Sequence, residues 1–189
     1  MKFRADKTDI KRYVEEGWWE ASKGLAEFVR ENAQRNPSGI AYRTSESQIS
    51  WNEYFHAAMG LAEQIKRETT KGGRILVWLP DCPDIHICYL ACEMAGVVTV
   101  GVGWKAGLQV LKYLSDVTGA SILLSKQNNP LGKLDDISEY LNLNSLSLED
   151  IFSNHIVDGE GPNLDGSIGP SDLWFLNSTS GTTGLPKCV

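Results

Sequence analysis

The sequence of 189 residues has the length of about one domain, enough to bury a hydrophobic core without disulfide bonds. Hydrophobic residues make up 42% and charged residues 22% of it, which excludes a wholly disordered, collagen-like or disulfide-scaffold chain. Eighteen Lys and Arg against 24 Asp and Glu give a net charge of −6, so the basic surface typical of a nucleic-acid-binding protein is not expected.

Targeting and membrane signals are also weak. The most apolar stretch, residues 87–104, is interrupted by Glu93 and several Gly, so we expect no membrane span. The N-terminus lacks the apolar segment of a secretory signal, and four Cys in a chain of this size do not form a disulfide framework. We therefore expect a reduced, cytoplasmic protein, whose oligomeric state stays open.

The first third of the chain predicts helices and one hairpin. Ser50 and Glu53 form a capping-box pattern, which favours a helix start at Trp51. That helix is expected to end near Gly72. The elements expected here are helices around 8–16 and from about 21 to 35, hairpin strands at 40–43 and 48–50, and a helix from 51 to about 71.

From residue 74 onward strands and helices alternate. Short β-branched runs predict strands at 74–79, 97–102 and 120–124, and apolar periodicity predicts helices at 83–95 and about 108–117. Pro83 suits a helix start and Gly96 a helix end. This alternation predicts an α/β fold with a mostly parallel sheet and crossover helices.

Residues 126–172 show a weaker pattern and are interpreted as a loop-rich insert. A short helix is possible at 131–141. Residues 157–172 hold four Gly and two Pro, which indicates a surface loop. A strand is expected again at 173–176.

The segment 178–187 reads STSGTTGLPK and follows directly on this last strand. Gly residues let backbone N–H groups approach a ligand, hydroxyl groups donate further hydrogen bonds, and Lys187 adds a positive charge. This composition favours phosphate binding over a plain polar turn. The spacing differs from a Walker A loop, because two residues separate Gly181 from Gly184 and Cys188 follows the lysine, so a P-loop NTPase is disfavoured.

This segment closely resembles the phosphate-binding signature of the adenylate-forming superfamily, which includes acyl-CoA synthetases and the adenylation domains of peptide synthetases. Upstream, Trp51-Asn52-Glu53-Tyr54 is similar to an early helix start of that family, residues 74–100 to its strand–helix–strand unit, and residues 107–124 to the following segment. The turn at 101–107 departs from the Pro-rich turn of many relatives, which puts its role in doubt.

The resemblance implies a two-step ligase that activates a small carboxylic acid with ATP and transfers the acyl group to coenzyme A, with Mg²⁺ accompanying the nucleotide. It implies that side-chain hydroxyls bind the β- and γ-phosphates and that two Gly permit close approach. Lys187 would act catalytically by neutralising charge on the pyrophosphate. The implied phosphate-binding residues are Thr179, Ser180, Gly181, Thr182, Thr183, Gly184 and Lys187, with no metal ligand among them.

Members of the family are considerably longer, so the resemblance predicts an N-terminal part of the large domain, incomplete and inactive without the downstream parts of the enzyme. The expected organisation is an N-terminal helical segment at 1–38 and, at 39–189, the N-terminal subdomain of the AMP-binding domain. Two alternatives stay open: an adenylation domain that loads a carrier-protein thiol, and a non-catalytic nucleotide-binding module.

The cysteines allow a functional and a structural interpretation. Cys82, His86, Cys88 and Cys92 lie close in sequence, but His86 points away from Cys88 on a helix, so small buried side chains are favoured over a metal site. For Cys188, a buried strand residue is favoured over a nucleophile. His56 and His155 have no partner that would give either a catalytic role.

Overall fold

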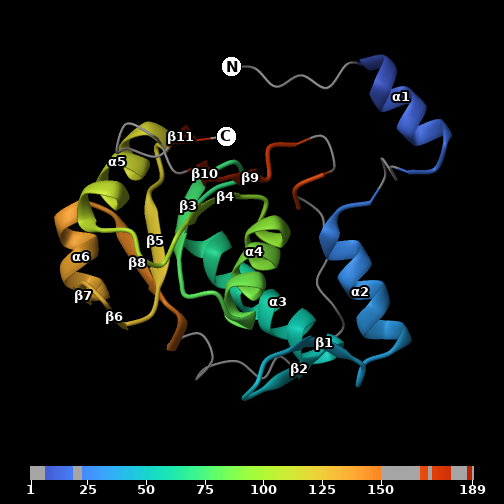
Figure 1. Ribbon diagram of the computed structural model, residues 1–189, viewed down its shortest axis with the longest axis horizontal. Coiled ribbons are helices and arrows are strands. Elements are labelled where there is room, and N and C mark those ends of the chain that lie inside the picture. Colours follow the sequence, from blue (N-terminus) through green and yellow to red (C-terminus); the bar gives the residue numbers. More distant parts are fainter. Residues whose placement is uncertain (1–6, 19–22, 150–166, 170–171, 180–186, 189) are drawn as a thin grey trace.

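A five-stranded parallel sheet forms the centre of the molecule (Figure 1). The computed structural model describes residues 7–18, 23–149, 167–169, 172–179 and 187–188. In the sheet order β8-β5-β3-β4-β9, every pair of neighbouring strands runs parallel, which confirms the predicted α/β fold. The strands are β3 (Arg74–Trp78), β4 (Val98–Val102), β5 (Ile122–Ser125), β8 (Asn144–Ser147) and β9 (Phe175–Leu176).

Helices cover both faces of this sheet and follow the predicted alternation. Gly96 and Gly119 end α4 and α5 in the left-handed conformation, with φ of 75° and 66°, which glycine adopts without a steric penalty. None of the described helices combines the length and apolarity that crossing a bilayer requires. The helices are α1 (Lys7–Glu15), α2 (Leu25–Arg35), α3 (Trp51–Glu68), α4 (Pro83–Ala95), α5 (Leu108–Thr118) and α6 (Leu134–Leu141).

Successive side chains of β3 point to opposite faces of the sheet, which divides the core into two layers. Ile75 and Val77 point to the face covered by α2, α3 and α4, whereas Leu76 and Trp78 point to the face covered by α5 and α6. All four side chains are fully buried. Because a parallel sheet with helices on both faces buries both sides of its strands, a continuous apolar run is required here.

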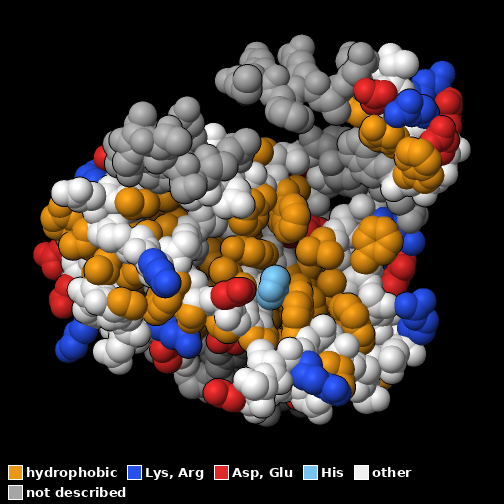
Figure 2. All heavy atoms as spheres, in the orientation of Figure 1, with side chains coloured by type: hydrophobic (Ala, Val, Ile, Leu, Met, Phe, Trp, Pro, Cys, Tyr) orange, Lys and Arg blue, Asp and Glu red, His pale blue; other side chains and the backbone are white. Residues whose placement is uncertain are grey.

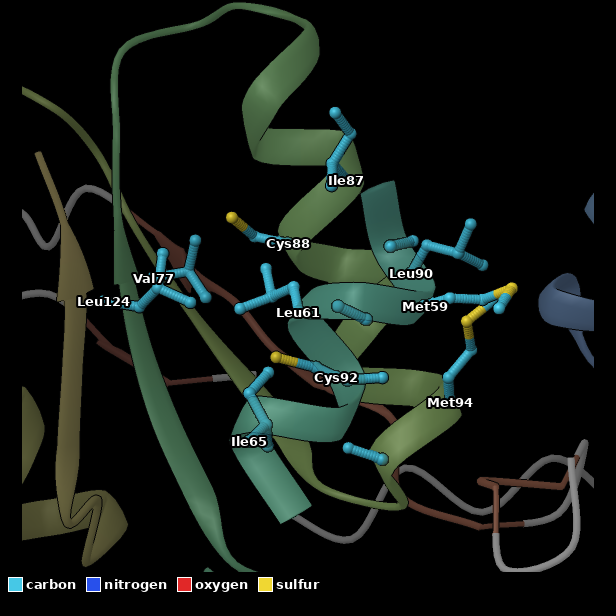
Figure 3. Packing of buried hydrophobic residues seen from close by; sticks show 14 of the residues in the cluster. Met59, Leu61, Ile65, Val77, Ile87, Cys88, Leu90, Cys92, Met94 and Leu124 are labelled. Carbon is cyan, nitrogen blue, oxygen red and sulfur yellow. The ribbon is translucent and has the colours of Figure 1, made fainter. Parts of the chain in front are cut away.

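The packing of α3 against α4 is the main helix–helix contact on the first face (Figure 3). Leu61 and Ile65 of α3 lie beside Cys88 and Cys92 of α4 and point toward the sheet. All four side chains have no exposed surface. Ala26, Val29 and Ala33 of α2 join the same cluster. The helix α2 therefore packs on the same core as α3 and α4.

Two elements differ from the sequence expectations. The helix α2 begins at Leu25 rather than near Ala21, because Gly24 has an extended backbone and acts as the N-cap. Within the predicted insert, the edge strand β8 extends the central sheet, and the insert also holds the helix α6 and a separate hairpin of β6 (Asn128–Asn129) and β7 (Gly132–Lys133). Most of the surface loop predicted at 157–172 lies outside the described residues.

The predicted start of α3 is confirmed in atomic detail. The strands β1 (Ile40–Arg43) and β2 (Gln48–Ser50) pair antiparallel and lead directly into this helix. The Ser50 hydroxyl accepts a hydrogen bond from the Glu53 N–H at 3.2 Å, and Glu53 Oε2 accepts one from the Ser50 N–H at 2.7 Å. Two N–H groups at the helix start, which lack intrahelical partners, are satisfied in this way.

Leu61→Ala should lower the free energy of unfolding by about 2–5 kcal/mol, because the truncation leaves a cavity between α3, α4 and the sheet. Val117→Ala is the control: this side chain on α5 is 53% exposed, and its truncation should change the free energy by less than about 0.5 kcal/mol. Urea unfolding monitored by circular dichroism measures both values. Equal effects of the two substitutions would contradict the assigned core.

A second prediction concerns pH. Hydrogen bonds from the backbone N–H and then the hydroxyl of Ser50 lower the pKa of Glu53 below 4.5. A lowered pKa in the folded state means that the stabilisation by the ionised carboxylate is present above the unfolded pKa and is lost as the pH falls through the folded pKa. Glu53→Gln should therefore reduce stability at neutral pH, and the difference from wild type should vanish on acidification below the folded pKa.

The control for this prediction is Glu63→Gln, which removes the same charge from the exposed surface of α3, where Glu63 faces Lys66 at 3.4 Å. Exposed pairs of this kind contribute little, so this variant should stay close to wild type across the titration. Thermal unfolding from pH 3 to 7 provides the comparison. A pH-independent difference between Glu53→Gln and wild type would contradict the capping-box assignment.

Candidate phosphate-binding site

The predicted phosphate loop starts at the edge of the central sheet. The strand β9 pairs with β4, with Thr99 opposite Phe175 and Val100 opposite Leu176. After Asn177, β10 (Ser178–Thr179) pairs antiparallel with β11 (Lys187–Cys188). The chain therefore leaves the carboxyl end of a parallel strand and enters the segment 178–187 through a paired stem.

The paired stem brings the two ends of the predicted loop together. Thr179 lies opposite Lys187 and Ser178 opposite Cys188 in the backbone register. The other predicted phosphate-binding residues, 180–184, lie outside the described residues. The structure thus places the backbone of Thr179 and Lys187 side by side, and the Asn177 side chain accepts a hydrogen bond from the Ser178 N–H at 2.8 Å. Asn177 was not singled out in the sequence.

Beside the stem, a cleft of about 570 Å³ opens at the carboxyl ends of β3 and β4. The chain leaves β3 toward α4 on one face of the sheet and leaves β4 toward α5 on the other. At such a reversal the connections diverge, which leaves a crevice where ligands of open α/β sheets commonly bind. The cleft is lined by Asp81, Tyr89, Gly101, Trp104, Lys105 and Asn177, among others.

Hydrogen bonds to Trp78 shape the wall of the cleft beyond β4. The indole N–H of Trp78 donates to the Trp104 carbonyl at 3.2 Å, and the two indole rings lie 5.0 Å apart between centroids. The Ser125 hydroxyl, fully buried, donates to the Trp78 carbonyl at 2.6 Å. These contacts position the turn after β4, whose role the sequence left in doubt, as part of the cleft.

The Phe175 ring of β9 lies against the wall that Tyr89 and Gly101 form. The Phe175 ring is 4.9 Å from the Tyr89 ring in an edge-to-face arrangement. A Cβ atom at Gly101 would lie 2.6 Å from Cζ of Phe175, so glycine is required for this close approach. Burial, followed by nearby thiols and Asp81, raises the pKa of Tyr89 to about 12, so its hydroxyl is protonated at neutral pH.

The surface around this wall is apolar. Figure 2 shows hydrophobic side chains gathered over α4 near the centre of the view. Ring contacts continue from Tyr89 to His86 and Tyr42, whose rings stack at 4.7 Å. His86 is thus part of an aromatic cluster. The cleft therefore combines an apolar wall with the charges of Asp81 and Lys105, both on exposed residues.

Two of the cysteines considered as metal ligands lie in the core. Cys88 and Cys92 are fully buried, and burial raises the pKa of both thiols, that of Cys92 to about 12. No group of three His, Cys, Asp or Glu in the described part of the chain is arranged to hold a metal ion. Cys188 lies in a strand, as predicted, but is exposed, so the expectation of burial was wrong. His155 lies outside the described residues.

The described geometry provides a hydroxyl- and glycine-rich segment with a closed stem beside an open cleft. The stem and the cleft share Asn177 as a boundary. The cleft is large enough for part of an organic ligand, and its boundary at Asn177 adjoins the stem that opens the segment 178–187.

Comparison with solved structures finds the same fold elsewhere. o-Succinylbenzoate coenzyme A synthetase (MenE) from Bacillus subtilis, in complex with AMP, superposes with a TM-score of 0.71 at 22% identity, covering 85% of this chain and 40% of that chain. At this identity the likeness establishes the fold.

Sequence relatives extend the comparison. Nonribosomal peptide synthetase 8 from Aspergillus fumigatus is 28% identical over 87% of this chain and 2% of its own length. A fatty acid–[acyl-carrier-protein] ligase, MmaC, from Mycobacterium marinum is 26% identical over 87% of this chain and 32% of its own length. This chain thus spans at most about a third of these two relatives. The sequence pattern of the AMP-binding enzyme family matches residues 29–189, and the protein belongs to that family.

Proposed function

We propose that this chain supplies the phosphate-binding part of an ATP-dependent ligase that activates a carboxylic acid as an acyl-adenylate. The observation that carries the proposal is the segment 178–187, which leaves the carboxyl end of β9 through the β10–β11 stem beside the cleft. Family membership supports the same reaction. On this proposal residues 39–189 form the N-terminal subdomain of an AMP-binding domain, preceded by the helical segment 1–38.

In the first step a carboxylate oxygen attacks the α-phosphorus of ATP, the α–β phosphoanhydride bond breaks, and pyrophosphate leaves. Hydroxyl groups of the segment donate hydrogen bonds to the departing phosphates, and Gly181 and Gly184 allow the backbone to approach them. Lys187 neutralises the charge that develops on the pyrophosphate. The proposed hydroxyl donors are Thr179, Ser180, Thr182 and Thr183.

The donor set fits a triphosphate with Mg²⁺. Magnesium sites at nucleotides use phosphate oxygens, water and one or two carboxylates, so a cluster of several acidic side chains in this chain is not required. When bound, Mg²⁺ neutralises phosphate charge and orients the leaving pyrophosphate. On this proposal residues of the segment 178–187 hold the phosphates. Pro186 limits how far this segment can collapse, because its ring fixes the backbone just before Lys187.

In the second step a thiol attacks the carbonyl carbon of the adenylate, AMP leaves, and a thioester forms. We propose coenzyme A as the acceptor. A carrier-protein thiol is the second candidate, favoured by the similarity to the acyl-carrier-protein ligase MmaC. The downstream part of a longer chain would provide the acyl pocket. A non-catalytic nucleotide-binding module would bind ATP without either step.

The deciding experiment is carboxylate-dependent ATP–pyrophosphate exchange, run on this chain and on the product of any longer reading frame that contains it. We expect exchange in the longer protein with particular acids only. ATP binding without exchange in both proteins would contradict the ligase and favour the module. Product analysis with coenzyme A or a phosphopantetheinylated carrier protein then distinguishes the two acceptors.

In the longer protein, Lys187→Ala should slow single-turnover adenylation by about 10²–10³-fold, because one charge-stabilising donor is lost at the leaving pyrophosphate, while acid binding stays close to wild type. Lys71→Ala is the matched control, since this exposed lysine precedes β3 at the opposite end of the sheet. Rapid-quench measurement of acyl-adenylate gives the rates. An unchanged rate in Lys187→Ala would overturn the assigned role.

A further inference from the structure

Glu93 is a charged residue in the core that the proposed chemistry does not use. It lies in the last turn of α4 and is 3% exposed. Burial raises the pKa of this carboxyl group, and hydrogen bonds from the backbone N–H groups of Ala26 and Leu25 oppose that shift. A buried carboxylate is costly unless it is hydrogen-bonded, so its partners indicate what it does.

The first partner is the N-terminus of α2. Glu93 Oε1 accepts a hydrogen bond from the Ala26 N–H at 2.8 Å. The N-cap residue of α2, Gly24, has no side chain to supply this bond, so a carboxylate from a different helix caps α2 and complements its dipole. A Cβ atom at Gly24 would lie 2.6 Å from Oε1, which explains why a glycine stands there.

The backbone of Glu93, rather than its carboxylate, contacts the segment that leads to β9. The Glu93 carbonyl accepts a hydrogen bond from the Ile168 N–H at 3.0 Å. Ile168 is 5% exposed, and its own carbonyl would lie 3.2 Å from a Cβ atom at Gly24. Three segments that are distant in sequence, around residues 24, 93 and 168, therefore meet at one point.

Hydrogen bonds hold the chain on its way from Ile168 to β9. The Gly169 N–H donates to Asp172 Oδ2 and the Asp172 N–H donates to the Gly169 carbonyl, both at 3.0 Å. The Trp174 carbonyl then accepts from the Thr99 N–H of β4 at 2.9 Å. The strand β9 has only two residues and pairs with β4 alone in the described sheet. Its position therefore depends strongly on how the preceding segment is held.

We propose that the Glu93 carboxylate is a positioning residue for the phosphate loop: it holds the N-terminus of α2, whose Gly24 lies against the Ile168 carbonyl, and thereby sets where the segment leading to β9 lies. The effect on nucleotide binding rests on the proposed function, whereas the mechanical coupling does not. Removal of the carboxylate should loosen the first turn of α2 and, through Gly24, the 167–179 segment, although the Ile168 N–H keeps its bond to the backbone carbonyl of residue 93. The central strands should be unaffected.

Hydrogen exchange of backbone amides, followed by mass spectrometry or NMR, tests the coupling in Glu93→Ala. We expect exchange to rise at least about tenfold in the first turn of α2 and in residues 168–179, with β3 and β5 unchanged. Glu93→Gln, whose amide oxygen still accepts from Ala26, should restore most of the protection. Ile65→Val is the control for general loss of packing, because it truncates the same core away from Glu93.

Wild-type exchange at residues 168–179 in a folded Glu93→Ala protein would overturn the proposal. A rise spread evenly over β3 and β5, as expected of Ile65→Val, would also overturn it, because it would indicate a merely structural role. If Glu93→Ala does not fold, Glu93→Asp is used instead, since its shorter side chain withdraws the carboxylate from the Ala26 N–H and keeps the charge. The local pattern expected for it is the same.

Calorimetric titration with Mg-ATP, run on the product of the longer reading frame, tests the functional part. The dissociation constant should rise about three- to tenfold in Glu93→Ala, recover in Glu93→Gln and stay unchanged in Ile65→Val. Equal affinities in wild type and Glu93→Ala, despite the exchange change, would overturn the positioning role. Absence of ATP binding by the longer wild-type protein would overturn the proposed function, while the exchange pattern would still decide whether Glu93 positions the strand.

Discussion

Burial of β3 on both faces is the constraint on which the rest of the structure depends. Ile75 and Val77 contact one helical layer and Leu76 and Trp78 the other, so neither layer can be lost without exposing a central strand. The parallel arrangement places the carboxyl ends of β3, β4 and β9 at the same end of the sheet. The cleft and the start of the phosphate segment both lie at that end because of this arrangement.

The described part of the chain that leads into the phosphate segment joins this core through the short strand β9. The strand β9 contributes two residues to the edge of the sheet, with Phe175 seated over Gly101. A loop that binds and releases a polyphosphate is expected to belong to the less stable parts of a fold. Its attachment at the edge, rather than at the centre, is consistent with that requirement. The hydrogen bond between Ile168 and the Glu93 carbonyl provides a second point of attachment before β9 in the chain.

Much of the fold could be predicted because its signals are local. Ser50 and Glu53 lie three residues apart and form the capping box that the pattern indicates. Gly96 ends α4 because only a residue that tolerates positive φ fits there. The strand β8 gave no comparable signal: Asn144–Ser147 is mostly polar, and its pairing with β5 comes from position at the sheet edge rather than from hydrophobicity. The start of α2 was misplaced because its N-cap is Gly24, which has no side chain, and the hydrogen bond to the first turn comes from the distant Glu93.

Local sequence patterns were enough to predict the parallel α/β architecture and to indicate phosphate binding by residues 178–187, because both inferences rest on residues close together in the chain. The tertiary structure was needed to show that the turn after β4, Tyr89 and Asn177 line one cleft, and that Glu93 caps a helix 67 residues away in sequence. Such contacts depend on how helices and strands pack around the sheet. Sequence periodicity describes which face of an element is buried, but not which distant polar group that face meets.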